Sequence, residues 1–248
     1  ILDNLKIQNN LIEQSWKNNV RRLLFLGSSC IYPKFAPQPI KEEYLLEDQL
    51  EETNQWYAIA KITGIKLCEA LRKQHKFDSI SLMPTNLYGP GDNYHHENSH
   101  VIPALIRKFY EAKISNLDQV TCWGSGKPLR EFLHVQDLAK ACIFALERWD
   151  PDNNKSPRFA NGKSLNYLNV GSGKDQSIKS LATKISQIIK FEGEIIWDIK
   201  KKDGTPRKLL DVSRINNLGW HSNISIEEGL ESTIKKFINN YSKNNLRL

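Results

Sequence analysis

Residues 21–29 read Arg-Arg-Leu-Leu-Phe-Leu-Gly-Ser-Ser, a short apolar run closed by small residues. Such a run is typical of a buried parallel strand that leads into a loop. Outward from it, the pattern predicts further strands over residues 79–84, 120–123, 165–170 and 195–197. Helices are expected over residues 1–19, 53–75, 101–112, 135–149, 177–191 and 225–241. Strands that alternate with helices in this way indicate an α/β fold with a parallel sheet.

The order of these elements also predicts where a ligand would bind. In a parallel sheet, ligands lie beyond the carboxyl ends of the strands. Ser28 and Cys30 follow the first strand, and Asn86 follows the second. We therefore expect these three side chains near one common site.

The composition narrows the class of protein. With 248 residues, 40% of them hydrophobic, the chain is long enough for one domain or two small ones. It contains no run of about 18 apolar residues and no signal-peptide pattern at its first residues, so no membrane partner is expected. The four cysteines show no CxxC spacing, which favours a reducing cytoplasm. The net charge of +7 suits an anionic partner.

Tyr57 and Lys61 form a Tyr-x-x-x-Lys pattern inside the helix expected over residues 53–75. Their spacing places both side chains on one helix face. A free tyrosine has a pKa of about 10, and we expect the Lys61 ammonium to lower the pKa of Tyr57, so that it exchanges a proton with a carbonyl or an alcohol. Taken alone, the pattern more often marks a tyrosine that packs beside a solvated lysine.

Ser28 changes that balance because it ends a buried strand upstream of the Tyr-x-x-x-Lys helix. A hydroxyl at that position can hydrogen-bond a substrate oxygen that Tyr57 also reaches, whereas a turn serine has no such role. Serine, tyrosine and lysine in this order resemble the short-chain dehydrogenase/reductases.

Longer motifs make the resemblance more specific. Residues 26–33, 57–61, 83–90, 98–105, 123–126, 130–135 and 203–208 are similar to motifs of the GDP-L-fucose synthase family, which are extended short-chain dehydrogenase/reductases. The resemblance implies 3,5-epimerisation of GDP-4-keto-6-deoxy-D-mannose, followed by NADPH-dependent reduction of its 4-keto group.

The resemblance also assigns catalytic roles. Ser28, Tyr57 and Lys61 match the reductase triad, and Cys30 and His100 match the acid/base pair of epimerisation. A thiol and an imidazole have pKa values of about 8.5 and 6.5, so both can move protons near neutrality. Read alone, Cys30 is more often a small buried hydrophobe, and His100 a loop or cap histidine.

Binding residues follow from the same resemblance, although any single one could also be an ordinary surface residue. The positions that match the NADPH site are Leu26, Gly27, Ser28, Ser29, Tyr57, Lys61, Pro84, Thr85, Asn86, Leu87 and His100. The positions that match the GDP-sugar site are Lys108, Trp123, Arg130 and Lys208.

The resemblance implies a Rossmann-like, doubly wound parallel sheet with a smaller C-terminal substrate domain. We expect residues 1–94 and 131–175 in the NADP-binding domain, and residues 95–130 and 176–248 in the GDP-sugar-binding domain. The family's GxxGxxG loop, which cradles a pyrophosphate, does not occur in this sequence, so the first strands of the sheet are expected to be missing. A homodimer is expected for a full-length protein.

Other functions are less favoured. Gly171-Ser172-Gly173-Lys174 lacks the remaining residues of a phosphate-binding loop, and His95, His96 and His100 lack a companion ligand set, so no metal is expected. Lys200-Lys201-Lys202 has no interleaved aromatics and is interpreted as a solvated loop, so no nucleic acid is expected. The alternatives that stay open are another nucleotide-sugar epimerase or dehydratase, and an inactive GDP-sugar-binding fragment. Against a dehydratase, Gln55-Trp56 precedes Tyr57 where an acidic pair is usual.

Overall fold

The computed structural model describes residues 1–248, and its contacts divide the chain into two units. Unit 1 comprises Ile1–Thr85, Asp137–Gly173 and Leu209–Ser222. Unit 2 comprises Asn86–Gln136, Lys174–Lys208 and Asn223–Leu248. These units differ from the expected domains in several segments. Residues 209–222, expected in the substrate domain, pack within unit 1, whereas residues 86–94, 131–136 and 174–175, expected in the NADP-binding domain, pack within unit 2.

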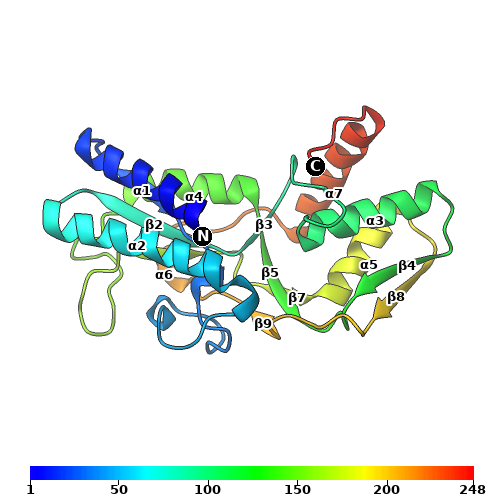
Figure 1. Ribbon diagram of the computed structural model, residues 1–248, viewed down its shortest axis with the longest axis horizontal. Coiled ribbons are helices and arrows are strands. Elements are labelled where there is room, and N and C mark those ends of the chain that lie inside the picture. Colours follow the sequence, from blue (N-terminus) through cyan, green and yellow to red (C-terminus); the bar gives the residue numbers. More distant parts are fainter. The chain divides into compact units, whose positions relative to one another are not determined.

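A parallel sheet forms the centre of unit 1, in the order β1 (Leu23–Leu26), β2 (Ser79–Pro84) and β6 (Tyr167–Val170) (Figure 1). All residues of β2 are buried, as expected for a parallel strand that is covered on both faces. The buried Ser79 hydroxyl is satisfied because it donates to the carbonyl of Cys68 at 2.8 Å.

The helices of unit 1 are α1 (Leu2–Lys17), α2 (Gln55–His75), most of α4 (Val135–Arg148) and α6 (Ser213–Asn217). Short 3-10 turns lie at Ser29–Ile31, Glu42–Tyr44 and Glu52–Asn54. Gly64 lets α2 approach β1 closely, because a Cβ at that position would overlap the Phe25 ring. This close contact brings the Tyr-x-x-x-Lys face of α2 to the end of β1.

Unit 2 contains two small sheets. One joins β3 (Asn86–Tyr88), β5 (Leu129–His134), β7 (Asp175–Ser177) and β9 (Arg207–Lys208), and the other pairs β4 (Gln119–Trp123) with β8 (Glu194–Asp198). The helices α3 (Val101–Ile114), α5 (Ile178–Ile189) and α7 (Ile226–Ser242) complete the unit. Their apolar faces share one core with these strands, which includes Phe109, Ile185 and Phe237. None of the chain's helices is both long enough and apolar enough to cross a bilayer.

The predicted α/β fold with parallel strands is confirmed, and each predicted helix and strand is present with its ends shifted by a few residues. The sequence analysis missed β3, β5, β7 and β9. β3, β7 and β9 are only two or three residues long, and β5 carries Arg130 and Glu131, which hid its apolar pattern. Glu131 is nevertheless fully buried.

Candidate active site

The carboxyl end of β1 carries Ser28. The amide of Gly27 still donates to Leu82 O of β2 at 2.9 Å, so the sheet extends one residue beyond β1. Ser28 has an extended backbone, and its Oγ accepts a hydrogen bond from the amide of Cys30 at 3.2 Å. This bond starts the 3-10 turn at Ser29–Ile31, which places Cys30 directly after the strand.

Tyr57 and Lys61 reach the same strand end from α2. The Tyr57 side chain lies close enough to Ser28 and to Cys30 for both to influence the pKa of its phenol. Lys61 donates from Nζ to the carbonyl of Leu26 at 2.8 Å and lies over the Phe25 ring. Ser28, Cys30, Tyr57 and Lys61 therefore share one site within unit 1, where three hydrogen-bonding groups and a thiol meet at the end of a parallel strand.

Burial has the largest effect on the pKa values of Tyr57 and Lys61. The pKa of Tyr57 is raised, first by burial and then by the nearby Cys30, while the hydrogen bond with Ser28 acts in the opposite direction. The prediction that Lys61 lowers the pKa of Tyr57 is wrong for this structure. The reason is geometric, because the Lys61 ammonium is directed at the Leu26 carbonyl and lies 5.9 Å from the centre of the Tyr57 ring. Burial also lowers the pKa of Lys61 itself.

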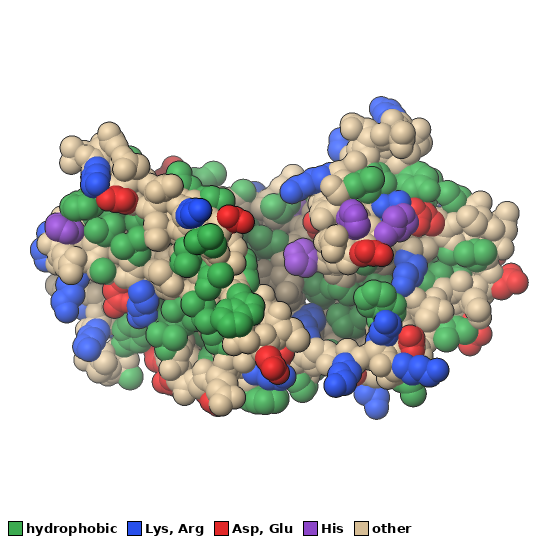
Figure 2. Space-filling model, viewed as in Figure 1, with side chains coloured by type: hydrophobic (Ala, Val, Ile, Leu, Met, Phe, Trp, Pro, Cys, Tyr) green, Lys and Arg blue, Asp and Glu red, His purple; other side chains and the backbone are tan.

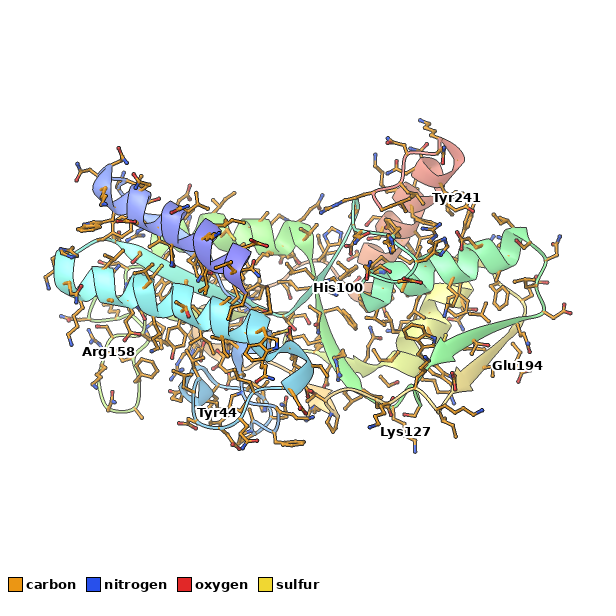
Figure 3. The ribbon with its side chains drawn as sticks, viewed as in Figure 1. Tyr44, His100, Lys127, Arg158, Glu194 and Tyr241 are labelled. Carbon is orange, nitrogen blue, oxygen red and sulfur yellow. The ribbon has the colours of Figure 1, made fainter.

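The remaining positions expected at the cofactor fall in both units, and those of unit 1 lie at two neighbouring strand ends. Leu26, Gly27 and Ser29 surround the end of β1, and Pro84 and Thr85 end β2, where the amide of Thr85 donates to Val170 O at 3.0 Å. Asn86 and Leu87 begin β3 in unit 2, and Asn86 donates from its side chain to Glu131 O at 2.8 Å. His100 is the exposed N-cap residue of α3 in unit 2 (Figure 3).

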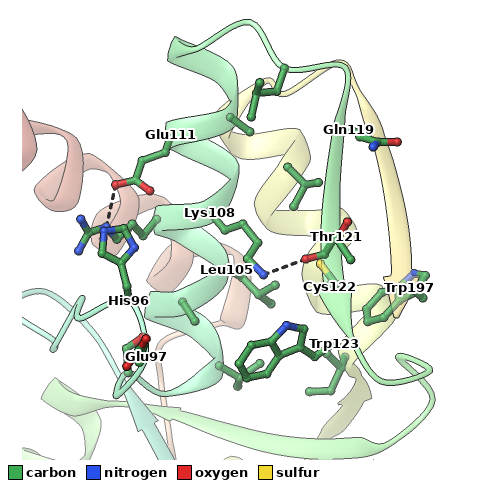
Figure 4. Close-up of a pocket in the computed structure, with 18 of the residues that line it drawn as sticks. His96, Glu97, Leu105, Lys108, Glu111, Gln119, Thr121, Cys122, Trp123 and Trp197 are labelled. Atoms are coloured by element: carbon green, nitrogen blue, oxygen red, sulfur yellow. Dashed lines mark hydrogen bonds and ion pairs between the residues drawn. The ribbon is translucent and has the colours of Figure 1, made fainter. Parts of the chain in front are cut away.

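Unit 2 holds a cavity of about 740 Å³ between α3 and β4 (Figure 4). Lys108 reaches into it from α3 and donates from Nζ to Thr121 O at 2.8 Å. The Trp123 side chain is 66% exposed, and both Lys108 and Lys201 lie over its ring, with their Nζ atoms 5.7 and 5.2 Å from the centre. An exposed indole with an ammonium nearby is a suitable surface for a flat, anionic nucleotide.

A second cavity of about 390 Å³ adjoins the first, since both are lined by Val101, Trp123 and Ile178. Arg130 lines this second cavity, and Lys208 is its direct neighbour across the β5–β9 ladder. Three of the four predicted substrate residues therefore surround two joined cavities, and Lys208 lies beside them on the next strand.

The sequence analysis missed Lys201 and Lys202, which it interpreted as part of a solvated loop. Both are exposed, but both line the smaller cavity together with Arg130. Asp203 holds this loop against the next one, because its carboxylate accepts from the amide and the hydroxyl of Ser125 at 2.9 and 2.6 Å. Nothing in the local pattern distinguishes these lysines from solvated ones, because the contact joins loops that are 78 residues apart.

Comparison with known proteins identifies the family to which this chain belongs. A model described as the NAD dependent epimerase/dehydratase family matches residues 1–160. GDP-L-fucose synthase 1 of Arabidopsis thaliana is 53% identical over 237 residues, which are 96% of this chain and 69% of that protein. GDP-L-fucose synthase of Escherichia coli strain K12 is 50% identical over 247 residues, with coverage of 98% and 74%.

Solved structures agree with the sequence relatives. A GDP-6-OMe-4-keto-L-xylo-heptose reductase from C. jejuni superimposes with a TM-score of 0.88 at 32% identity, covering 97% of this chain and 76% of that one. A GDP-L-fucose synthetase from Naegleria fowleri bound to NADP gives a TM-score of 0.86 at 27% identity, covering 100% and 74%. The chain therefore belongs to the NAD dependent epimerase/dehydratase family. Within that family, it groups with the GDP-L-fucose synthases.

The family and its NADP-bound member indicate a nicotinamide cofactor. The residues of unit 1 fit one. Lys61 carries three N–H donors and uses one of them on Leu26 O, which leaves two for the hydroxyls of a ribose. Tyr57 remains 36% exposed beside it, so its hydroxyl is accessible to a bound ligand.

Proposed function

We propose that this protein makes GDP-L-fucose from GDP-4-keto-6-deoxy-D-mannose, by epimerisation at C3 and C5 followed by NADPH-dependent reduction at C4. The observation that carries the proposal is the thiol of Cys30 beside the Ser28–Tyr57 pair. A plain ketone reductase needs the two hydroxyls and the lysine but has no use for a thiol. An enzyme that also inverts carbons next to the ketone has a use for such a thiol.

The epimerisation step follows from the acidity of carbons that flank a ketone. Tyr57 and Ser28 donate hydrogen bonds to the ketone oxygen, which stabilises the enolate formed when a neighbouring carbon loses its proton. Cys30 and His100 act as the pair that removes a proton and returns one on the opposite face, which inverts the carbon. The pKa of Tyr57 is not lowered toward neutrality, so its phenol is protonated at neutral pH, as in a free tyrosine, and able to donate.

The reduction step uses the same oxygen. When bound at this site, NADPH would supply the hydride for C4 of the sugar. Tyr57 gives its proton to the oxygen that becomes the new hydroxyl, and Ser28 holds that oxygen in place. Lys61 binds the ribose hydroxyls next to the nicotinamide with the two donors that Leu26 O leaves free. The other residues at the ends of β1 and β2 line the same cofactor site.

The two cavities of unit 2 support a GDP-sugar as substrate. The larger cavity has room for a purine nucleoside, and its Trp123 offers a flat apolar face. The smaller cavity is lined by Arg130 and by Lys201 and Lys202, whose charges suit a diphosphate. Lys208, opposite Arg130 in the ladder, adds another positive charge. The substrate's base and diphosphate would thus bind on either side of Trp123.

Replacement of Cys30 tests the proposal. The Cys30→Ser variant should lose deuterium incorporation from solvent into the sugar by a factor of about 10²–10⁴, the usual contribution of a general acid or base. Binding of NADPH should be nearly unchanged. Cys142→Ser is the matched control, because Cys142 is also half-buried but lies on α4. Exchange at the parent rate in Cys30→Ser would contradict the proton-transfer role.

Self-association and a cytoplasmic location stay predictions. Ile7, Leu11 and Trp56 on α1 and α2 are more than 60% exposed. Figure 2 shows hydrophobic side chains on the face where α1 and α2 lie, which is the kind of apolar surface that a homodimer covers. All four cysteines are free, in keeping with a reducing compartment. Sedimentation of the protein with and without NADPH would test the dimer.

A further inference from the structure

The 3-10 turn that carries Cys30 has few bonds of its own. It spans only Ser29–Ile31, between the end of β1 and Tyr32. Its internal bonds are the amide of Cys30 to Ser28 Oγ at 3.2 Å and the amide of Ile31 to Ser28 O at 3.3 Å. Both are longer than the 2.9–3.0 Å that is typical of a strong N–H···O bond. The turn is therefore held mainly by the packing of its buried residues Ser29 and Ile31 and by contacts of its neighbours.

Tyr32, the next residue, makes one such contact through a directed hydrogen bond. Its side chain is 3% exposed, and its hydroxyl donates to Oδ1 of Asn169 at 2.6 Å. Asn169 lies on β6 and is completely buried. The bond therefore links the turn to a strand that is 137 residues away in sequence and paired to β2.

The amide group of Asn169 has only one workable orientation. Its Nδ2 donates to Ile40 O at 2.9 Å and to Asp211 O at 3.2 Å, and only the NH₂ end can serve two carbonyls. Oδ1 is thereby directed at Tyr32. The side chain is fully paired and cannot rotate without leaving buried carbonyls unsatisfied.

The backbone of Asn169 is fixed as well. Its amide donates to Glu42 Oε1 at 3.0 Å, and Glu42 Oε2 accepts from Arg214 Nη1 at 2.7 Å. Glu42 is 1% exposed, so this chain of bonds lies in the interior of unit 1. The acceptor that Tyr32 meets is therefore a rigid one.

We propose that the Tyr32–Asn169 hydrogen bond is a positioning device, which holds the turn so that the Cys30 thiol keeps its place beside Tyr57. Neither residue touches the reacting atoms, and the functional part of the inference rests on the proposed role of Cys30. A displacement of about 1 Å can lower a proton-transfer rate by about 10²-fold, so a short tether matters at this distance. Ser28 lies closer to the sheet ladder at Gly27, so the tether should matter more for Cys30 than for Ser28.

Tyr32→Phe removes the tether and retains the ring. Tyr88→Phe is the matched control, because Tyr88 is also buried and its hydroxyl donates to a carbonyl, Ser225 O at 3.5 Å, but it lies in unit 2 and outside the Glu42–Asn169 chain of bonds. In Tyr32→Phe, we expect deuterium exchange to fall at least tenfold and at least threefold more than hydride transfer. In Tyr88→Phe, the ratio of the two rates should stay at the parent value.

A second measurement does not depend on activity. The rate at which iodoacetamide modifies each cysteine of the ligand-free protein can be followed by peptide mass spectrometry. At Cys30, this rate should change at least threefold in Tyr32→Phe. The rate at Cys142, half-buried on α4, should not change. The inference would be overturned if the modification rate of Cys30 did not change. It would also be overturned if deuterium exchange and hydride transfer fell by the same factor in each tyrosine variant. If Cys30→Ser retained full exchange, the proposed function would fail, while the modification rates would still decide whether Tyr32 holds the turn.

Discussion

Removal of Arg214 is expected to expose the cost of the carboxyl group buried at Glu42. Arg214 donates to Glu42 and to Glu43, and the Glu42 side chain is only 2% exposed. Burial raises the pKa of Glu42, and Arg214 is one of the groups that lower it again. In Arg214→Met, Glu43 can turn to water because its side chain is 26% exposed, but Glu42 cannot.

The size of the effect follows from this difference. Loss of one partner of a buried ion pair typically costs about 3–5 kcal/mol, because the other charge stays buried. Protonation of Glu42 should relieve part of this cost in the variant. The folded variant then keeps a proton on Glu42 at pH values where the unfolded chain, with the usual pKa of glutamate, has released it. Stability conferred by a raised carboxyl pKa is present at low pH and is lost as pH rises. The variant should therefore lose up to about 1.4 kcal/mol per pH unit above pH 5, relative to the parent.

Urea denaturation at pH 5 and pH 7, followed by tryptophan fluorescence and circular dichroism, measures this prediction. Arg207→Met is the control, because its ion pair with Asp175 lies at a side chain that is 42% exposed and should contribute no more than about 1 kcal/mol. Glu42→Gln combined with Arg214→Met should recover much of the loss and remove the pH dependence. A loss in Arg214→Met that is no larger than in Arg207→Met, or equal at both pH values, would refute the reasoning.

Three further predictions concern the proposed active site. Lys61→Met should weaken NADPH binding at least tenfold. It should leave the alkaline limb of the pH–rate profile in place, because burial rather than Lys61 sets the pKa of Tyr57. A shifted limb would show instead that Lys61 controls the pKa of Tyr57. Calorimetry should show that Trp123→Ala weakens GDP binding at least tenfold and that Trp123→Phe weakens it much less. If Trp123→Ala bound GDP as tightly as the parent, Trp123 would not belong to the binding surface. Gly64→Ala should destabilise the protein by about 1–3 kcal/mol in urea, because its methyl group would overlap the Phe25 ring, and an unchanged midpoint would contradict that packing.

Local patterns were sufficient to predict the main elements of both units. Strands such as β2 stand out because their residues are buried on both faces, and helices such as α5 because their apolar residues recur on one face. The short strands were missed because pairing, rather than their own sequence, defines them. β9 consists of Arg207 and Lys208 alone and is a strand only because it lies beside β5.

The candidate catalytic residues were easier to predict than the residues that we propose hold the Cys30 turn. Ser28, Tyr57 and Lys61 carry a signal in their order and spacing, which the structure brings together at one strand end. Tyr32 and Asn169 carry no such signal, because their bond joins segments 137 residues apart and depends on a buried amide whose orientation two distant carbonyls set. A support of this kind is visible only in three dimensions.

The pKa of Tyr57 needed the structure for the same reason. From spacing alone, the ammonium four residues away was expected to control it. In the folded chain, Lys61 is committed to the Leu26 carbonyl, while Tyr57 is partly buried against Cys30 and Ser28. The phenol is therefore protonated throughout the neutral range, which is the form that both proposed steps require: it donates to the enolate oxygen in the first and gives up its proton in the second. The phenol is thus protonated without any contribution from Lys61, which leaves two Lys61 donors available for its proposed role at the cofactor.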